Sequence, residues 1–103
     1  MTNNTTPIPN RLKIARTAAG LSQKELGIAA GIDEFSSSAR MNQYETGKHI
    51  PDYLTLKNIG NVLKCPVAYF YVEDDLLAEV ILAFHRVNKA NKKLIIGYVS
   101  NIK

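Results

Sequence analysis

The segment LSQKELGIAAG, from Leu21 to Gly31, constrains the fold most strongly because it specifies one short helix with a defined start and end. Ser22 and Glu25 have the spacing of a capping box, in which each residue's side chain accepts a hydrogen bond from the other's backbone N–H. Leu21 and Leu26 stand at the positions of a hydrophobic staple, and Gly31 suits the left-handed residue that ends a helix. A chain that starts and stops helices this closely must pack several short ones.

Helical signals recur along the rest of the chain, and no stretch shows the sustained period-two alternation of a half-buried strand. The spacing predicts a helix at about residues 10–19, one behind Asp52, a short turn after Pro66, one opened by Asp74 or Asp75, and a last one in NKKLIIGYVSNIK. In the first helix Arg11, Lys13 and Arg16 are expected to point outward. The residues expected to face a core are Leu12, Ile14, Ala15, Ala18, Leu56, Ile59, Val62, Leu63, Leu77, Val80, Ile81 and Phe84.

The totals fit one small domain, since the 103 residues are 46% hydrophobic and 21% charged. No apolar run approaches the roughly 18 residues that a membrane-spanning helix needs. The polar start, MTNNTTPIPN, lacks the parts of a secretory signal, which predicts a flexible arm over residues 1–9 and a cytoplasmic protein. Cys65 is the single cysteine, so an internal disulfide is excluded.

The charge is unevenly distributed along the chain. The net charge of +4 divides into +3 over residues 1–64, −4 over residues 65–85 and +5 over residues 86–103. A basic balance favours contact with polyanions, although many basic proteins bind no nucleic acid. The acidic middle section leaves two basic ends as candidate contact regions.

Residues 36–50, SSSARMNQYETGKHI, form a polar stretch that is predicted to be a helix. Ser37 is the expected cap, Met41 and Tyr44 are three apart and can face the core, and Gly47 is expected to end the helix. Arg can pair with guanine, Asn or Gln with adenine, and Ala with the thymine methyl group, so the outer face suits base readout. Without further signals, a solvated helix surface is the more typical interpretation of such a face. The outward residues are Ser38, Ala39, Arg40, Asn42 and Gln43.

Three motifs in order, SQKELGIAAGI, MNQYETG and, after Pro51, LTLKNIGNVL, resemble the Cro/repressor-type helix-turn-helix family, also called the XRE family. The resemblance covers about residues 10–71, and the order and separation of S-Q-x-E-L and Y-E-x-G are its most specific parts. It implies an all-α, lambda-repressor-like domain of about five short helices, here followed by one or two more. In such a pair, one helix crosses the DNA backbone and the next enters the major groove.

The resemblance also implies residue roles. Gln23, Lys24 and Lys48 are expected at phosphates, and Arg40 at a base or a nearby phosphate. Arg16 is expected to pair with Glu45 in a structural ion pair that keeps this carboxylate away from DNA. The remaining residues expected to contact DNA are Ser37, Ser38, Ala39, Asn42 and Gln43.

The chain departs from the family pattern at residues 32–36, IDEFS, where the turn is about four residues longer than the tight family turn. Asp33 and Glu34 bring negative charge toward the expected DNA side. Asp33 can cap a longer helix, or Phe35 can pin the turn to the core while the acids point away. The sequence does not choose between these arrangements.

Other chemistry finds little support. The serines, histidines and scattered acids form no GxSxG, Walker-type, HExxH or glycine-rich nucleotide motif, so we expect no enzyme. His49, Cys65 and His85 lack paired ligand spacing, so we expect no metal and no cofactor. Cys65 is more typical of a small buried residue. The aromatic run at residues 69–71 is more typical of packing than of base stacking.

The C-terminal segment predicts an interface, because its apolar helical face has too little chain left to cover it. The residues on this face are Leu94, Ile95, Tyr98, Val99 and Ile102. Two copies can place two recognition helices roughly 34 Å apart and read a palindromic site in double-stranded DNA. A solubilising face beside this interface is a better fit than a second DNA contact for Arg86, Lys89, Lys92 and Lys93.

The sequence therefore predicts an arm (1–9), a helix-turn-helix DNA-binding domain (10–72) and a helical dimerisation segment (73–103). The predicted function is a sequence-specific transcriptional regulator, with repression at an operator the simpler mode. The alternative is an antitoxin-type module that autoregulates its operon and binds a protein partner through its C-terminal segment. Membrane association is not expected.

Overall fold

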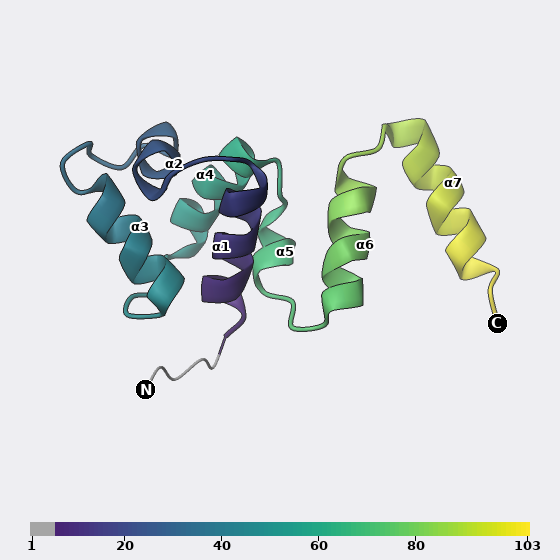
Figure 1. The fold of residues 1–103 in the computed structure, drawn as a ribbon. Coiled ribbons are helices and arrows are strands. Elements are labelled where there is room, and N and C mark those ends of the chain that lie inside the picture. The colour runs from purple at the N-terminus through teal and green to yellow at the C-terminus, as the bar shows by residue number, and fades with distance from the viewer. Residues whose placement is uncertain (1–5) are drawn as a thin grey trace.

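The computed structural model describes residues 6–103, and within them the chain forms seven helices and no strand (Figure 1). The predicted all-α fold is confirmed. In chain order the helices are α1 (Ile8–Ala18), α2 (Gln23–Ala29), α3 (Ser37–Thr46), α4 (Tyr53–Leu63), α5 (Val67–Phe70), α6 (Asp75–His85) and α7 (Lys89–Ser100). The first five pack together, α6 lies beside them, and α7 is the outermost helix (Figure 1).

The core lies among α1 to α5. Tyr69 and Phe70 are both buried and meet edge to face, with ring centroids 5.4 Å apart. The neighbouring Tyr71 is half exposed, so two of the three aromatic residues in this run serve packing. Cys65 is also buried, and burial raises the pKa of its thiol. The fully buried large side chains are Ile8, Leu12, Leu26, Met41, Leu56, Ile59 and Phe70.

The first helix presents a different face to the core from the one predicted. It begins at Ile8, two residues before the expected start, and Ile8 is buried. The buried stripe runs from Ile8 through Leu12 to Ala15, at the i, i+4, i+7 spacing of one helical face. Ile14 and Ala18, which were expected to face the core, are exposed as a result. Of the arm predicted over residues 1–9, residues 1–5 lie outside the described residues.

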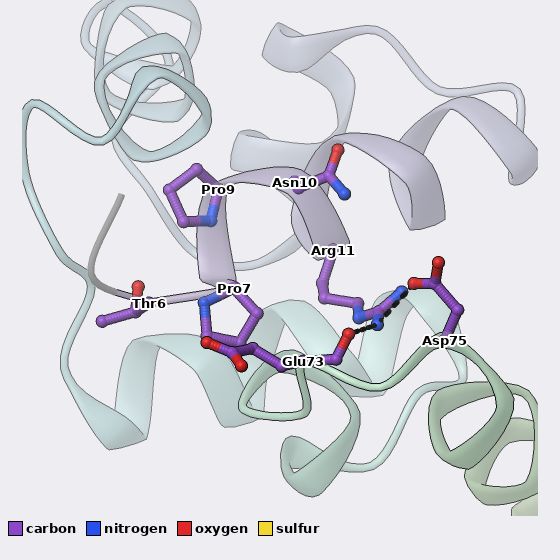
Figure 2. A pocket seen from close by; sticks show the side chains of 7 residues that line it. All are labelled: Thr6, Pro7, Pro9, Asn10, Arg11, Glu73 and Asp75. Atoms are coloured by element: carbon purple, nitrogen blue, oxygen red, sulfur yellow. Dashed lines mark hydrogen bonds and ion pairs between the residues drawn. The ribbon is translucent and has the colours of Figure 1, made fainter. Parts of the chain in front are cut away.

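Arg11 faces inward, although it was predicted to point outward (Figure 2). Its guanidinium donates to the Glu73 carbonyl oxygen and to Asp75 Oδ1, both at 2.9 Å, as Figure 2 shows. It also donates to the Val72 carbonyl oxygen at 2.8 Å and lies over the Tyr69 ring. Only 5% of the residue is exposed. Arg11 therefore ties the first turn of α1 to the start of α6.

A second arginine ties the other end of α6 to the domain. Arg86 Nε donates to the carbonyl oxygen of Lys64 at 3.1 Å, and its Nη2 donates to that of Leu63 at 3.3 Å. These carbonyls end α4, where the helix dipole favours a positive charge. Arg11 and Arg86 hold α6 at both ends.

The apolar contact of α6 with the core is small. Its one fully buried residue is Ala78, and Ile81 and Leu82 pack beside it. Leu77 and Val80, predicted to face the core, are 49% and 57% exposed. The prediction for Leu77 and Val80 was wrong because the small residue Ala78, rather than these larger ones, makes the closest approach of α6 to the core.

Among the described residues, α7 buries none of its own side chains. It follows α6 after a short turn and runs back at an angle to it (Figure 1). The Lys92 ammonium lies 5.6 Å from the centre of the Phe84 ring, a contact between the two helices next to the turn. The radius of gyration of 15.1 Å exceeds the roughly 13 Å of a compact chain of this length. No helix in the described part of the chain is long and apolar enough to cross a membrane.

The clamp at Arg11 can be tested by Arg11→Met, which keeps the aliphatic length and removes the donors. We expect the free energy of unfolding to fall by about 2–3 kcal/mol in urea denaturation, because the Val72 and Glu73 carbonyl groups lose their hydrogen bonds to a charged donor. Lys13→Met on the exposed side of α1 is the control, with a change within about 0.5 kcal/mol. Equal effects of the two substitutions would show that the clamp adds no stability.

Candidate nucleic-acid interface

The start of α2 is fixed by the predicted capping box. Ser22 Oγ accepts from the backbone N–H of Glu25 at 3.0 Å, and Glu25 Oε1 accepts from the backbone N–H of Ser22 at 2.8 Å. The hydrogen bond from the Ser22 backbone lowers the pKa of the Glu25 carboxyl, so the box is complete in the ionised form. This sets where Gln23 and Lys24, the next two residues, leave the helix.

Arg16, Gln23 and Glu45 connect three helices. Arg16 Nε and Nη2 donate to the two carboxylate oxygens of Glu45, the second at 3.0 Å, and Nη1 donates to the Leu21 carbonyl at 2.8 Å. The hydrogen bond to Glu45 raises the pKa of Arg16 above its ordinary value. Gln23 Nε2 donates to Glu45 Oε1 at 3.1 Å. The Glu45 side chain is only 3% exposed, so the expected pair withdraws this carboxylate from the surface.

Ser37 does not have the role predicted for it. Its side chain is buried and donates from Oγ to the Lys24 carbonyl at 2.8 Å, so it neither caps α3 nor reaches a nucleic acid. The approach requires a glycine opposite, because a Cβ on Gly27 would lie 1.9 Å from Ser37 Oγ. This close contact sets the distance between α2 and the start of α3.

The rest of α3 presents the predicted polar face. Met41 and Tyr44 are buried, and Gln43 is half-buried. Asn42 Oδ1 accepts from Gln23 Nε2 at 3.2 Å, so one outward amide is held in place by the preceding helix. Thr46, one turn beyond Asn42, extends the same face and was not among the predicted residues. The exposed predicted residues are Ser38, Ala39, Arg40 and Asn42.

The enlarged turn takes neither of the two forms considered from the sequence. Asp33 does not cap a longer helix, since α3 begins only at Ser37. Its Oδ2 instead accepts from the Phe35 N–H at 3.0 Å, and its carbonyl accepts from the Ser36 N–H at 3.0 Å. Phe35 does not pin the turn to the core, because it is 93% exposed.

The loop after α3 begins at Gly47, whose φ of 81° is a left-handed conformation that glycine adopts without strain. The backbone N–H of His49 donates a hydrogen bond to the Gln43 carbonyl at 3.2 Å. Arg40, Gln43, His49 and neighbouring residues line a shallow concavity beside the helix. Lys48 is exposed next to it.

These features describe a surface that can bind nucleic acid. A helix of this kind fits the major groove of B-DNA, which is about 12 Å wide, and Arg, Asn and Gln carry the donors and acceptors that distinguish base pairs. Lys24, in the first turn of α2, and Lys48, in the loop after α3, are both exposed and suit phosphates. Among the described residues no three His, Cys, Asp or Glu side chains gather as metal ligands would.

Comparisons with known proteins agree with this geometry. A family model described as helix-turn-helix matches residues 12–70. Two relatives named as uncharacterized HTH-type transcriptional regulators, from Sinorhizobium medicae (strain WSM419) and Rhizobium meliloti (strain 1021), are each 31% identical over 64 residues, which are 62% of this chain and 43% of theirs. The matched segment thus spans less than half of these relatives. The crystal structure of the transcriptional regulator BswR aligns with a TM-score of 0.86 and 44% identity, covering 92% of this chain and 94% of that one.

The contact of Gly27 with Ser37 can be tested by Gly27→Ala. The added methyl group overlaps Ser37 Oγ, so we expect α3 to shift and the free energy of unfolding to fall by about 1–3 kcal/mol, measured in urea. Adding Ser37→Ala should restore part of the loss. Gly97→Ala in α7, where no described atom lies within 4 Å of the added carbon, should change stability little or raise it. Equal stability of the two alanine variants would contradict the proposed close packing.

Proposed function

This chain belongs to the Cro/repressor-type helix-turn-helix family of transcriptional regulators, and we propose that it represses transcription by occupying a palindromic operator as a homodimer in the cytoplasm. The observation that carries the proposal is the sorting of side chains on α3. Met41, Tyr44 and Glu45 are turned into the protein, which leaves a polar outward face. A helix with this distribution has its recognition groups free for base edges.

Recognition of the DNA bases is assigned to Arg40, Asn42 and Gln43. Arg40 suits guanine O6 and N7, and the amides suit adenine N6 and N7. The hydrogen bond from Gln23 occupies one lone pair of Asn42 Oδ1 and fixes the amide in one orientation. The second lone pair and the amide N–H groups stay free for an adenine, so part of the ordering cost of binding is met before DNA arrives. Ser38 and Ala39 complete the base-facing group.

Affinity for the DNA backbone is assigned to the two exposed lysines near α3. Lys24, in the first turn of α2, and Lys48, in the loop after α3, are both exposed and can neutralise phosphates. Gln23 supports these contacts indirectly, because both of its amide hydrogens are donated within the protein, to Asn42 and Glu45, and its side chain has no donor left for a phosphate. Because phosphate contacts release counterions, the binding should weaken steeply as salt rises.

The exposed apolar face of α7 is assigned to binding a second copy of this chain. Tyr98 is 72% exposed, and the residues around it in the helix are apolar, which is unusual for a surface that stays in water. The charges favour a like partner, since residues 86–103 carry +5 while residues 65–85 carry −4. The basic α7 of one copy therefore complements the acidic α6 of the other. The interface residues proposed are Leu94, Ile95, Tyr98, Val99 and Ile102.

The proposal as a whole is tested by selecting bound duplexes from random DNA with the full chain. We expect a palindromic motif whose half-sites are centred about 34 Å apart, one turn of B-DNA. A motif without two-fold symmetry would contradict the dimer. Failure to enrich any motif would contradict sequence-specific binding. An antitoxin-type protein would instead require a different protein on α7, and a chain that stays monomeric in isolation would favour that alternative.

The reading face is tested by Arg40→Ala and Gln43→Ala. Each should lose about 1–3 kcal/mol of discrimination between the selected operator and random DNA, without a change in folding, because each removes donors or acceptors for a base pair. The measurement is a binding titration against both duplexes at fixed salt. Lys57→Ala, on the exposed side of α4, is the control and should bind as the wild type does. If both variants discriminate normally, the reading face has been misplaced.

The dimer surface is tested by Tyr98→Asp and Val99→Asp. A charge on this face would have to be buried without a partner, so we expect monomers in sedimentation and weaker binding to the palindromic operator. Ser100→Asp, on the opposite side of the same helix, is the matched control and should remain dimeric. Unchanged sedimentation of the two face variants would place the interface elsewhere.

A further inference from the structure

Phe35 is the most exposed of the large apolar residues described, at 93%, ahead of Leu76 at 74%. It lies two residues before the start of α3, at the tip of the enlarged turn. A single exposed apolar residue needs no explanation by itself. The place of this one does, because the N-terminal half of a recognition helix is the part that enters the major groove.

The turn that carries Phe35 is held by hydrogen bonds at both of its ends. On the α2 side, the Ile32 N–H donates to the Gly27 carbonyl at 2.9 Å. On the α3 side, the Arg40 N–H donates to the Ser36 carbonyl at 2.8 Å. Between them, the Asp33 carboxylate accepts from the Phe35 N–H. The ring is therefore presented to solvent from an ordered backbone, which lowers the entropy lost when it meets a ligand.

The charges of the turn disfavour contact between this segment and the phosphate backbone of DNA. Residues 32–39, IDEFSSSA, contain two acids and no cation, so the segment as a whole is repelled by phosphates. In the major groove, the N4 amino group of cytosine and the N6 amino group of adenine donate hydrogen bonds, so a carboxylate can lie beside them. Thymine presents an apolar C5 methyl group there. The Phe35 ring carries no hydrogen-bond donor, so the apolar methyl group of thymine is the base group that it suits.

We propose that Phe35 enters the major groove ahead of α3 and packs against the C5 methyl group of a thymine in each half-site. This inference rests on the proposed operator binding and extends it, because it adds a base contact from the turn at residues 32–36 to the contacts assigned to α3. Phe35 thereby acts as a specificity determinant for thymine over cytosine at one position.

The test removes the ring and the methyl group separately. The operator is taken from the selection, and each thymine in turn is replaced symmetrically by deoxyuridine, which lacks only the C5 methyl group. For the wild-type chain, one position should lose about fourfold per half-site in affinity, the value of one buried methyl group, or about fifteenfold for the dimer. Phe35→Ala should lose at least as much on the thymine operator and should show no further loss on the deoxyuridine operator.

Controls separate this contact from folding and from the proposed function. Tyr71→Ala, a half-exposed aromatic residue at the end of α5, should bind both operators as the wild type does. If Phe35→Ala binds the thymine operator normally while Gln43→Ala is impaired, this inference fails and operator binding stands. If Phe35→Ala retains the wild type's sensitivity to deoxyuridine, the ring does not contact the methyl group. If the wild-type chain enriches no operator at all, the proposed function fails together with this inference.

Discussion

The buried pair of Arg16 and Glu45 is the interaction on which the rest of the interface depends. A glutamate near the end of a helix that approaches DNA would repel phosphates if it were exposed. Burying it alone would cost several kcal/mol, so its burial needs a partner with several donors. Arg16 supplies two of its N–H groups to the carboxylate and a third to the Leu21 carbonyl, and Gln23 adds another donor. The same contacts join the first three helices, so one ion pair both removes an exposed carboxylate and holds α3, the proposed recognition helix, in its orientation.

Arginine has this structural use throughout the molecule. The chain has four arginines, all of them within the described residues, and three of them donate to backbone carbonyls. Arg11 and Arg86 fix the two ends of α6, and Arg16 fixes α1 to α2 and α3. Only Arg40 stands on the outward face of α3. The basic composition therefore overstates the charge that is free for nucleic acid, because a planar guanidinium with five donors is also well suited to joining helix ends.

The sequence predicted best those features that depend on near neighbours. The capping box at Ser22 and Glu25 needs residues three apart, and the helices that follow from caps and glycines appear where expected. The role of Arg11 depends on Val72, Glu73 and Asp75, more than 60 positions away, and no local pattern contains that information. Burial of Ser37 depends on the missing side chain of Gly27 on another helix. The exposed state of Phe35 depends on a turn whose length, but not whose hydrogen bonds, is visible in the sequence.

The two clamps on α6 also connect the two halves of the proposed function. Arg11 and Arg86 bond the two ends of α6 to the domain that carries α3, which fixes the position of α6 relative to α3. The connection to α7 is short, since α6 ends at His85 and α7 begins at Lys89, and the Asn88 side chain caps α7 by accepting from the Asn91 N–H at 2.8 Å. With so few residues between the helices, the proposed dimer surface on α7 is closely coupled to the domain that carries the proposed reading surface. If α7 joins two copies, the distance between their recognition helices depends on the angle at this turn and on the contacts of Arg86, which hold the end of α6 against the end of α4.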